Sequence, residues 1–295
     1  MNIYRNWFLA SRPWSFTMTA ISVSVGSALG AIDGGFSWGL YLLTLLATVL
    51  MHAATNLIND YYDVQSGVDT QEVSTAQYRP HPLVEGKLAA GHVKTAAYSL
   101  YGLSILLGIY LAAIRGWTLI WIGLAGAFAS LTYTAPPLKY KYKALGEISV
   151  FIMWGPLMVA GAYFVQRQAF SLDAFWISLP FGALVALVLL ANNIRDIKHD
   201  RDKGIMTLAI VLGQRQGMLL YLILVVIAYL AVILMSIFGP LYLWSLMVLL
   251  SLPLAFKLLR LMMKQIPADA DARTAQLDTA FGVLLVLSLV LEGIF

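Results

Sequence analysis

The sequence predicts an all-α integral membrane protein with nine transmembrane helices. Hydrophobic residues make up 60% of the 295 residues, only 12% are charged, and the mean hydropathy is +0.78. Soluble domains carry about 25% charged residues. The apolar residues also gather in runs of about 20, the length that crosses a bilayer core as a helix. A third observation, the unequal charge of the connections between the runs, supports the same class.

The expected spans follow one another with little sequence left over. We place them at residues 14–32, 38–59, 94–114, 117–134, 145–165, 172–193, 217–238, 241–261 and 276–294. Because these helices and their connections use nearly the whole chain, we expect a single transmembrane domain over residues 1–295 and no separate soluble domain.

The charged residues predict the orientation. With the N-terminus inside, all 19 lysines and arginines fall on the cytoplasmic side except Arg115 and Arg167, as the positive-inside rule requires. We therefore expect a multi-pass protein of the cell membrane. The net charge of +4 follows from this topology and does not suggest nucleic acid. The chain has no cysteine, which excludes disulfides and thiolate metal sites, and no feature implies an obligate protein partner.

A first acidic motif ends the second span. On a helix, Asp60 and Asp63 lie at about +40° and −20° from Asn56, so the three side chains share one face, and Asp69 follows a little beyond. Neighbouring carboxylates repel each other unless a cation lies between them. Mg²⁺ commonly binds through one or two carboxylates together with substrate phosphates. The motif therefore predicts a cation site at the membrane edge.

A second acidic motif, Asn192, Asp196 and Asp200, ends the sixth span. If the helix continues, its four-residue spacing places all three side chains on one face. A single motif of this kind is also found in ordinary acidic helix ends. Two copies that both begin Asn-x-x-x-Asp, each at the end of an apolar run, favour function.

The two motifs suggest an internal duplication. They lie on the second and sixth spans, and this even offset gives them the same orientation. We interpret residues of about 12–143 and about 144–264 as two parallel four-helix repeats, with a ninth helix at about 276–294. Transporters also contain internal repeats, so duplication alone does not separate an enzyme from a transporter.

Several basic residues lie near the acidic motifs. The prolines after the fourth span turn the chain, and Lys139, Lys141 and Lys143 follow at alternate positions. Alone they would be interpreted as positive-inside residues at lipid headgroups. Beside two acidic motifs, we expect at least one lysine to balance a polyphosphate. Arg79 and Lys203 are further candidates.

Four other polar residues have simpler interpretations. His52 lies one turn before Asn56 and is read first as a hydrogen-bonded packing residue, with a functional role left open. His199 is expected to point away from the second motif. Asp278 and Glu147 open helices near the cytoplasmic surface, where negative charge is favoured, and we expect them to be solvated.

The motifs together resemble those of the UbiA-type intramembrane prenyltransferases. The matching stretches are Asn56-x-x-Asn59-Asp60-x-x-Asp63-x-x-x-Gly67-x-Asp69, Tyr133-x-x-Pro136-Pro137-x-Lys139, and Asn192-x-x-x-Asp196-x-x-x-Asp200-x-x-x-Gly204-x-x-Thr207-Leu208. Two further stretches resemble the branch of the family that prenylates 1,4-dihydroxy-2-naphthoate. They are Arg12-Pro13-Trp14-Ser15-Phe16 and Asn59-Asp60-Tyr61-Tyr62-Asp63.

Some positions depart from the family pattern. Many members carry the third acid of the first motif at the position of Gly67, whereas this chain has Asp69. Relatives often have a lysine where this chain has Ile205. The stretch Arg79-Pro80-His81-Pro82 also differs from what naphthoate enzymes carry there.

The resemblance implies a fold and a reaction. Members surround a central cavity with nine helices and place both motifs at its cytoplasmic rim. Mg²⁺ would bridge the catalytic carboxylates and a polyprenyl diphosphate; these are Asp60, Asp63, Asp196 and Asp200. The expected substrate contacts are Asn56, Asn59, Asp69, Arg79, Tyr133, Lys139, Lys143, Asn192 and Lys203. The expected reaction is prenyl transfer to an aromatic acceptor, foremost 1,4-dihydroxy-2-naphthoate in menaquinone biosynthesis.

Two kinds of alternative remain. Relatives also use homogentisate, 4-hydroxybenzoate, a porphyrin derivative or a glycerol phosphate as acceptor. A cation-coupled secondary transporter would also carry ionisable residues in its spans, although here the acids gather at one face. For the enzyme, we expect carboxylates of the two motifs to come within roughly 10 Å, because a metal–phosphate–metal bridge must fit between them.

Overall fold

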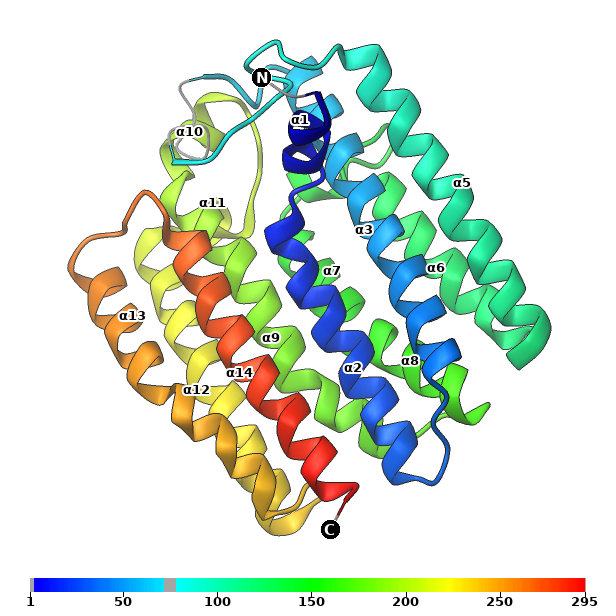
Figure 1. Cartoon of the computed structure of the whole chain (residues 1–295). Helices are drawn as coiled ribbons and strands as arrows, with labels where there is room; N and C mark the ends of the chain where they lie inside the picture. The colour runs from blue at the N-terminus through cyan, green and yellow to red at the C-terminus, as the bar shows by residue number, and fades with distance from the viewer. Residues whose placement is uncertain (1–2, 72–77, 295) are drawn as a thin grey trace.

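The computed structural model describes residues 3–71 and 78–294 and confirms the all-helical class (Figure 1). The amino-terminal half contains α1 (Ile3–Ala10), η1 (Pro13–Ser15), α2 (Phe16–Ile32), α3 (Trp38–Gln65), α5 (Ala90–Arg115), α6 (Thr118–Thr132) and η2 (Tyr140–Tyr142). The remainder contains α7 (Gly146–Ile152), η3 (Met153–Leu157), α8 (Met158–Arg167), α9 (Leu172–Arg195), α10 (Ile197–Asp202), α11 (Leu208–Leu212), α12 (Gln214–Phe238), η4 (Leu243–Ser251), α13 (Leu252–Lys264) and α14 (Ala270–Glu292).

Eight helical segments of the described chain are long and apolar enough to cross a bilayer. They are Ile3–Ile32, Trp38–Gln65, Ala90–Arg115, Gly146–Arg167, Leu172–Arg195, Gln214–Phe238, Leu243–Lys264 and Ala270–Glu292. The position of the expected fourth span is taken by α6, which is apolar but has only 15 residues. At 1.5 Å per residue such a helix is about 22 Å long, which is shorter than a bilayer core of about 30 Å.

Helix α9 forms the centre of the largest core. Phe181, Leu184, Leu187 and Leu190 are each at most 1% exposed, and the helix packs against α12 and α14 and also against α7 and η3. A helix that is apolar on all sides is expected in such a central position. A smaller core joins α3 to α5. In Figure 1, α3, α5 and α6 lie on one side of the molecule and α12, α13 and α14 on the other.

The fifth span is distorted at its middle. Between α7 and α8, the π-helical segment η3 carries Pro156 and a non-helical backbone at Gly155. The distortion brings this backbone against α9, where a Cβ on Gly182 would lie 2.9 Å from the Gly155 Cα. Ser22 donates a hydrogen bond of 2.6 Å to the carbonyl oxygen of Trp154. Within a bilayer each freed backbone group needs such a partner, so the bend is supported by α2 and α9 together.

Asp278 and Glu147 are buried, and the prediction that they are solvated is wrong. Helix α14 begins two turns before Asp278, which is 0% exposed. Neither of its carboxyl oxygens has a hydrogen-bond partner among residues 3–71 and 78–294. Glu147 is 6% exposed and accepts a hydrogen bond of 2.8 Å from Asn193. Both residues therefore belong to the interior of the bundle.

Asp278→Leu is expected to stabilise the protein. Leucine has the same branching as aspartate and removes two buried polar atoms that lack partners, each of which costs about 1–3 kcal/mol. We expect the midpoint of thermal unfolding in detergent to rise by several degrees. Asp278→Asn keeps the shape and the unpaired polar atoms, so it should gain much less. A lower midpoint for Asp278→Leu would mean that the carboxyl makes an interaction in the protein that stabilises the fold.

Candidate active site

A cavity of about 750 Å³ lies between the helices. Its walls come from α2, α3, α5, α6, α9, α14 and the span formed by α7, η3 and α8, and most of them are apolar. The charged residues that line it are concentrated at one end, where α3 and α9 finish. Pockets of this size hold small organic ligands, so the cavity offers a charged end and a long apolar interior.

The first motif lies at the charged end of α3. Asn56 donates hydrogen bonds to the Ser11 carbonyl oxygen at 2.9 Å and to Ser15 Oγ at 3.1 Å. Asn59 accepts one of 2.8 Å from Thr134. These bonds attach the chain before α2 and the chain after α6 to α3. The two asparagines therefore position neighbouring segments, and both also line the cavity.

The carboxylates of the first motif are paired with cations. Asp60 forms an ion pair with Arg12 and is only 3% exposed. Asp63 accepts hydrogen bonds from Lys141, at 2.7 Å, and from the Tyr142 hydroxyl. Of these two acids, Asp63 lines the cavity and Asp60 does not.

Asp69 completes a candidate metal cluster with a histidine. Asp60, Asp69 and His81 each offer a ligand atom, and these atoms lie within 4.8 Å of one another. Burial alone would raise the pKa of Asp69, but a hydrogen bond from His81 and the charges of Lys141 and Arg12 lower it to about 2. Asp69 is therefore an ionised carboxylate, and oxygen and imidazole donors suit a divalent ion.

The second motif is interrupted by a break in the helix. Helix α9 ends at Arg195, Asp196 has φ −98° and ψ 10°, and α10 begins at Ile197. The single helical face was expected on the condition that the helix continues, and the helix is interrupted at Asp196. All three motif residues nevertheless line the cavity, and backbone hydrogen bonds from Asp196 to Asn192 (3.0 Å) and from Asp200 to Asp196 (2.9 Å) keep the four-residue repeat through the turn.

Arg195 neutralises the second motif. It donates to Asn192 at 2.7 Å, to Asp196 at 2.6 Å and to Asp271 at 2.6 Å. Its side chain is only 5% exposed. The Tyr78 hydroxyl donates to the same Asp271 at 2.6 Å. The arginine, two carboxylates, an amide and a phenol form one buried network, in which Asp271 comes from the start of α14.

Asp200 has a different environment from Asp196. Burial and the negative charge of Asp196 raise the pKa of Asp200 to about 6, although Lys141, His199 and Arg195 oppose this. A cation between these carboxylates would offset both the burial of Asp200 and its repulsion by Asp196, and would therefore favour the ionised form of Asp200. The residue is therefore well placed to bind a divalent ion.

The two motifs meet at the same end of the cavity. His199, which lies within the second motif, contacts the Val68 carbonyl oxygen through Nε2 at 3.1 Å. The chain after α6 is tied to the loop after α10, because Ala144 donates to the Met206 carbonyl oxygen at 2.8 Å. Lys141 lies on this connection and interacts electrostatically with Asp63, Asp69 and Asp200. Burial by itself would lower the pKa of Lys141, but the charges of Asp63 and its neighbours raise it, so the ammonium stays charged.

Of the lysines considered for the site, Lys139, Lys143 and Lys203 do not line the cavity, whereas Lys141 does. Lys143 and Lys203 are exposed and Lys139 is half-buried. In an extended chain, Lys139, Lys141 and Lys143 would share one face. Here Lys139 has a positive φ of 44° and the chain enters the short 3₁₀ helix η2, where residues two apart point about 240° from each other. Lys141 alone of the three faces the acids.

The other residues predicted to contact the substrate lie at the cavity wall. Arg79 and Tyr133 both line the cavity. The Arg79 guanidinium lies 5.8 Å from the centre of the Trp14 ring and 4.0 Å from Asp271 Oδ2. The Tyr133 ring packs edge-on against Tyr140 with ring centres 5.4 Å apart.

Sequence reasoning did not select Arg12, Lys141, Arg195 and Asp271 as site residues. Two of them carried a signal: Arg12 opens a stretch that resembles the family, and Lys141 belongs to the lysine run. Arg195 falls within the second motif but reads as an ordinary positive-inside residue. Asp271 follows no motif, so only the structure places it beside α9.

These features define a membrane-embedded helical bundle whose acidic motifs share one cavity. The sequence profile of the UbiA prenyltransferase family matches residues 19–285, and the chain belongs to this family. It is 32% identical over 289 residues to the 1,4-dihydroxy-2-naphthoate octaprenyltransferase of Bacillus subtilis, covering 96% of this chain and 91% of the relative. It is also 32% identical over 290 residues to the UbiA prenyltransferase domain-containing protein 1 of Mus musculus, covering 97% and 84%.

Solved structures share the fold. A UbiA homologue from Archaeoglobus fulgidus, bound to GPP and Mg²⁺, superposes with a TM-score of 0.65 at 16% identity and covers 96% of this chain and 99% of its own. A digeranylgeranylglyceryl phosphate synthase superposes with a TM-score of 0.66 at 17% identity, covering 100% and 99%.

Proposed function

We propose that this protein transfers a polyprenyl group from a prenyl diphosphate to an aromatic acceptor, 1,4-dihydroxy-2-naphthoate, in menaquinone biosynthesis. The observation that carries the proposal is the convergence of both acidic motifs at one end of a single apolar cavity. The name of the Bacillus subtilis relative supports this acceptor. The charged end would lie at the cytoplasmic surface, in accord with the distribution of lysine and arginine.

The residues at the charged end fit a divalent metal ion. Asp60, Asp69 and His81 could hold one ion, and Asp63, Asp196 and Asp200 offer further carboxylate oxygens around the diphosphate. Mg²⁺ bound there would neutralise the diphosphate and help it to leave. The Mg²⁺ and GPP in the Archaeoglobus fulgidus homologue support this assignment.

The protein's own cations would assist the same step. When the C1–O bond of the prenyl diphosphate breaks, its electron pair stays on the diphosphate oxygen. Arg12, Arg79 and Lys141 line the cavity at the place where this negative charge develops. Fixed cations in a site with little water stabilise such charge more than they would in solution.

The apolar interior would protect the allylic cation. Water would capture C1, whereas walls of methionine, valine and isoleucine exclude it. A carbon of the aromatic acceptor then forms the new bond to C1. The ring regains aromaticity when that carbon loses its proton or, if it bears the carboxylate, loses CO₂, and the electron pair of the broken bond returns to the ring. The isoprenoid tail would occupy the rest of the cavity.

A transfer assay tests the function. Purified protein is mixed with a polyprenyl diphosphate, Mg²⁺ and one acceptor at a time, and the prenylated product is quantified. We expect product with 1,4-dihydroxy-2-naphthoate and its loss on chelation by EDTA, with recovery when Mg²⁺ is restored. Homogentisate, 4-hydroxybenzoate, a porphyrin derivative and a glycerol phosphate are the comparison acceptors. Product only with one of these would overturn the naphthoate assignment, and no product with any would overturn the transferase.

A further inference from the structure

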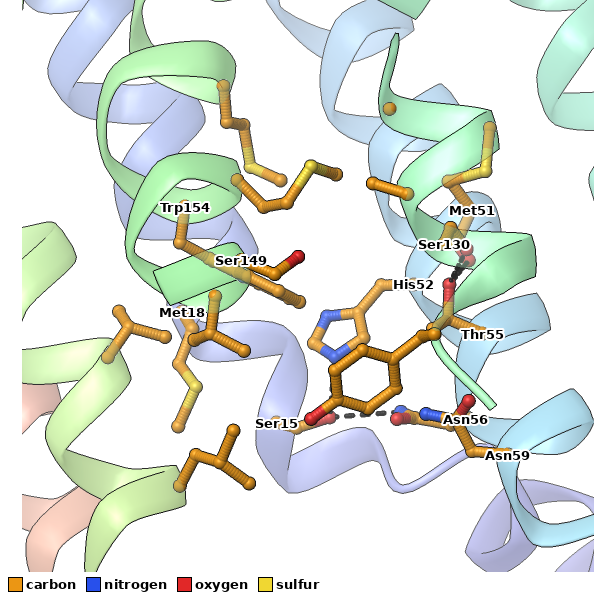
Figure 2. A pocket seen from close by; sticks show the side chains of 18 of the residues that line it. Ser15, Met18, Met51, His52, Thr55, Asn56, Asn59, Ser130, Ser149 and Trp154 are labelled. Atoms are coloured by element: carbon orange, nitrogen blue, oxygen red, sulfur yellow. Dashed lines mark hydrogen bonds between the residues drawn. The ribbon is translucent and has the colours of Figure 1, made fainter. Parts of the chain in front are cut away.

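A small polar niche interrupts the apolar interior of the cavity. It consists of Ser15, Thr19, His52 and Trp154, from η1, α2, α3 and η3. His52 and Trp154 line the cavity, and their rings meet edge-on with centres 4.9 Å apart. Figure 2 shows the imidazole between Trp154 and Asn56, with Ser15 close by. The reaction steps described above do not use this niche.

The hydrogen-bond network assigns the tautomer of His52. The Ser15 hydroxyl donates its only hydrogen to the Arg12 carbonyl oxygen, at 2.8 Å. Toward His52, which is 3.3 Å away, Ser15 Oγ can therefore only accept. The proton of a neutral imidazole must then be on Nε2. Nδ1, left bare, accepts from the Thr19 hydroxyl at 2.8 Å.

The Nδ1 side of the imidazole is held firmly by hydrogen bonds, whereas the Nε2 side is held weakly. Thr19 is 0% exposed, and its oxygen accepts a further hydrogen bond of 3.2 Å from Trp154 Nε1. The contact from Nε2 to Ser15 is 3.3 Å, longer than the usual 2.9–3.0 Å for such bonds. The Nε2–H is therefore a weakly engaged donor on a ring that is fixed from behind.

The helix distortion at η3 positions Trp154 in this niche. It places Trp154 in the middle of its span, with its carbonyl oxygen bound by Ser22 and its indole N–H bound by Thr19. π-helical segments are frequent at functional sites. An indole face beside a hydrogen-bond donor suits a flat aromatic molecule that carries an oxygen.

The depth of the niche suits an aromatic acceptor. His52 lies four residues before Asn56 and eight before Asp60, which is about 6 Å and about 12 Å along the axis of α3. C1 of a prenyl diphosphate lies next to its diphosphate, and a reacting ring carbon must come within about 3.5 Å of it. An oxygen on the far side of that ring would reach the depth of His52. An isoprenoid tail has no atom that could accept a hydrogen bond there.

We propose that the Nε2–H of His52 binds a hydroxyl or carboxylate oxygen of the aromatic acceptor, while Trp154 packs against the acceptor ring. His52 is thus a specificity-determining residue for the acceptor. This inference rests on the proposed prenyl transfer to an aromatic compound. It concerns acceptor recognition and leaves the binding of the prenyl diphosphate unchanged.

The test compares His52→Phe with His52→Gln. Phenylalanine keeps a flat ring and removes the donor, whereas glutamine places an amide N–H close to the position of Nε2. We expect His52→Phe to raise the acceptor KM by about tenfold to a hundredfold, with the KM for prenyl diphosphate within twofold of wild type. His52→Gln should recover most of the acceptor affinity. Thr48→Val is the matched control, because the Thr48 hydroxyl on the same helix already donates to the Thr44 carbonyl oxygen at 2.8 Å.

Paired acceptors make the test specific. The wild type should prefer a hydroxylated naphthoate over an analogue that lacks one ring hydroxyl by about tenfold or more, and His52→Phe should reduce this preference to about twofold. An unchanged acceptor KM and preference in His52→Phe would overturn the niche assignment while transfer itself persists. A parallel loss of prenyl diphosphate affinity would also overturn it. Failure of the wild type to prenylate any aromatic acceptor would instead refute the proposed function.

Discussion

Asp63→Asn and Asp200→Asn are each expected to reduce prenyl transfer by about 100-fold to 1000-fold, the usual cost of losing one group that stabilises charge in a transition state. Both carboxylates line the charged end of the cavity, one from each acidic motif. If both carboxylates act on the same metal-bound diphosphate, removing either one already disrupts the binding of that diphosphate. The double variant should then be only slightly slower than the worse single variant.

The comparison requires kcat/KM values for the wild type, both single variants and the double variant at saturating Mg²⁺. Asparagine preserves the shape of aspartate, and unfolding midpoints in detergent show whether each variant folds. Asp173→Asn is a matched control, since Asp173 is exposed at the opposite end of α9 from the second motif. Losses that multiply fully in the double variant would show that the motifs act independently.

Arg195→Met is expected to destabilise the protein by about 3–5 kcal/mol, because it leaves buried charge without a partner. The arginine pairs with Asp196 and Asp271, and the three side chains are only 5%, 6% and 11% exposed. Methionine has a similar length, so the loss arises from charge and hydrogen bonding more than from packing. The unfolding midpoint in detergent, with chemical denaturation as a second measure, tests this expectation.

Two further variants sharpen the comparison. Arg273→Met removes an exposed pair with Asp269, whose side chains are 42% and 36% exposed, and should cost at most about 0.5 kcal/mol. Arg195→Met combined with Asp271→Asn removes one of the two stranded charges and should recover part of the stability. Equal effects of Arg195→Met and Arg273→Met would contradict a buried network.

The membrane-spanning fold was predictable because it depends on composition over long runs. Each expected span corresponds to a helical segment, and the motif residues Asn56 and Asn192 lie in the expected helices α3 and α9. The shortness of α6 was not predictable, because Tyr133 and Thr134 continue its apolar pattern. The division into two repeats and the cytoplasmic orientation remain predictions.

The details of the site depend on local backbone geometry that periodicity does not reveal. The break at Asp196 leaves the four-residue spacing of the second motif unchanged, so the sequence pattern still favours one continuous face. The turn at Lys139 similarly decides which lysine enters the site. Asp271 lies 75 residues after Asp196 in the chain, and only the packing of α14 against α9 brings them to the same arginine.

The most direct measurement is equilibrium binding of an unreactive prenyl thiolodiphosphate to the purified protein, with and without Mg²⁺. The central claim is that both acidic motifs hold one diphosphate through a divalent ion. It predicts tight binding only when Mg²⁺ is present, and a similar loss of Mg²⁺-dependent affinity in Asp63→Asn and in Asp200→Asn. Binding that is equally tight in EDTA, or that responds to only one of the two substitutions, would contradict the claim.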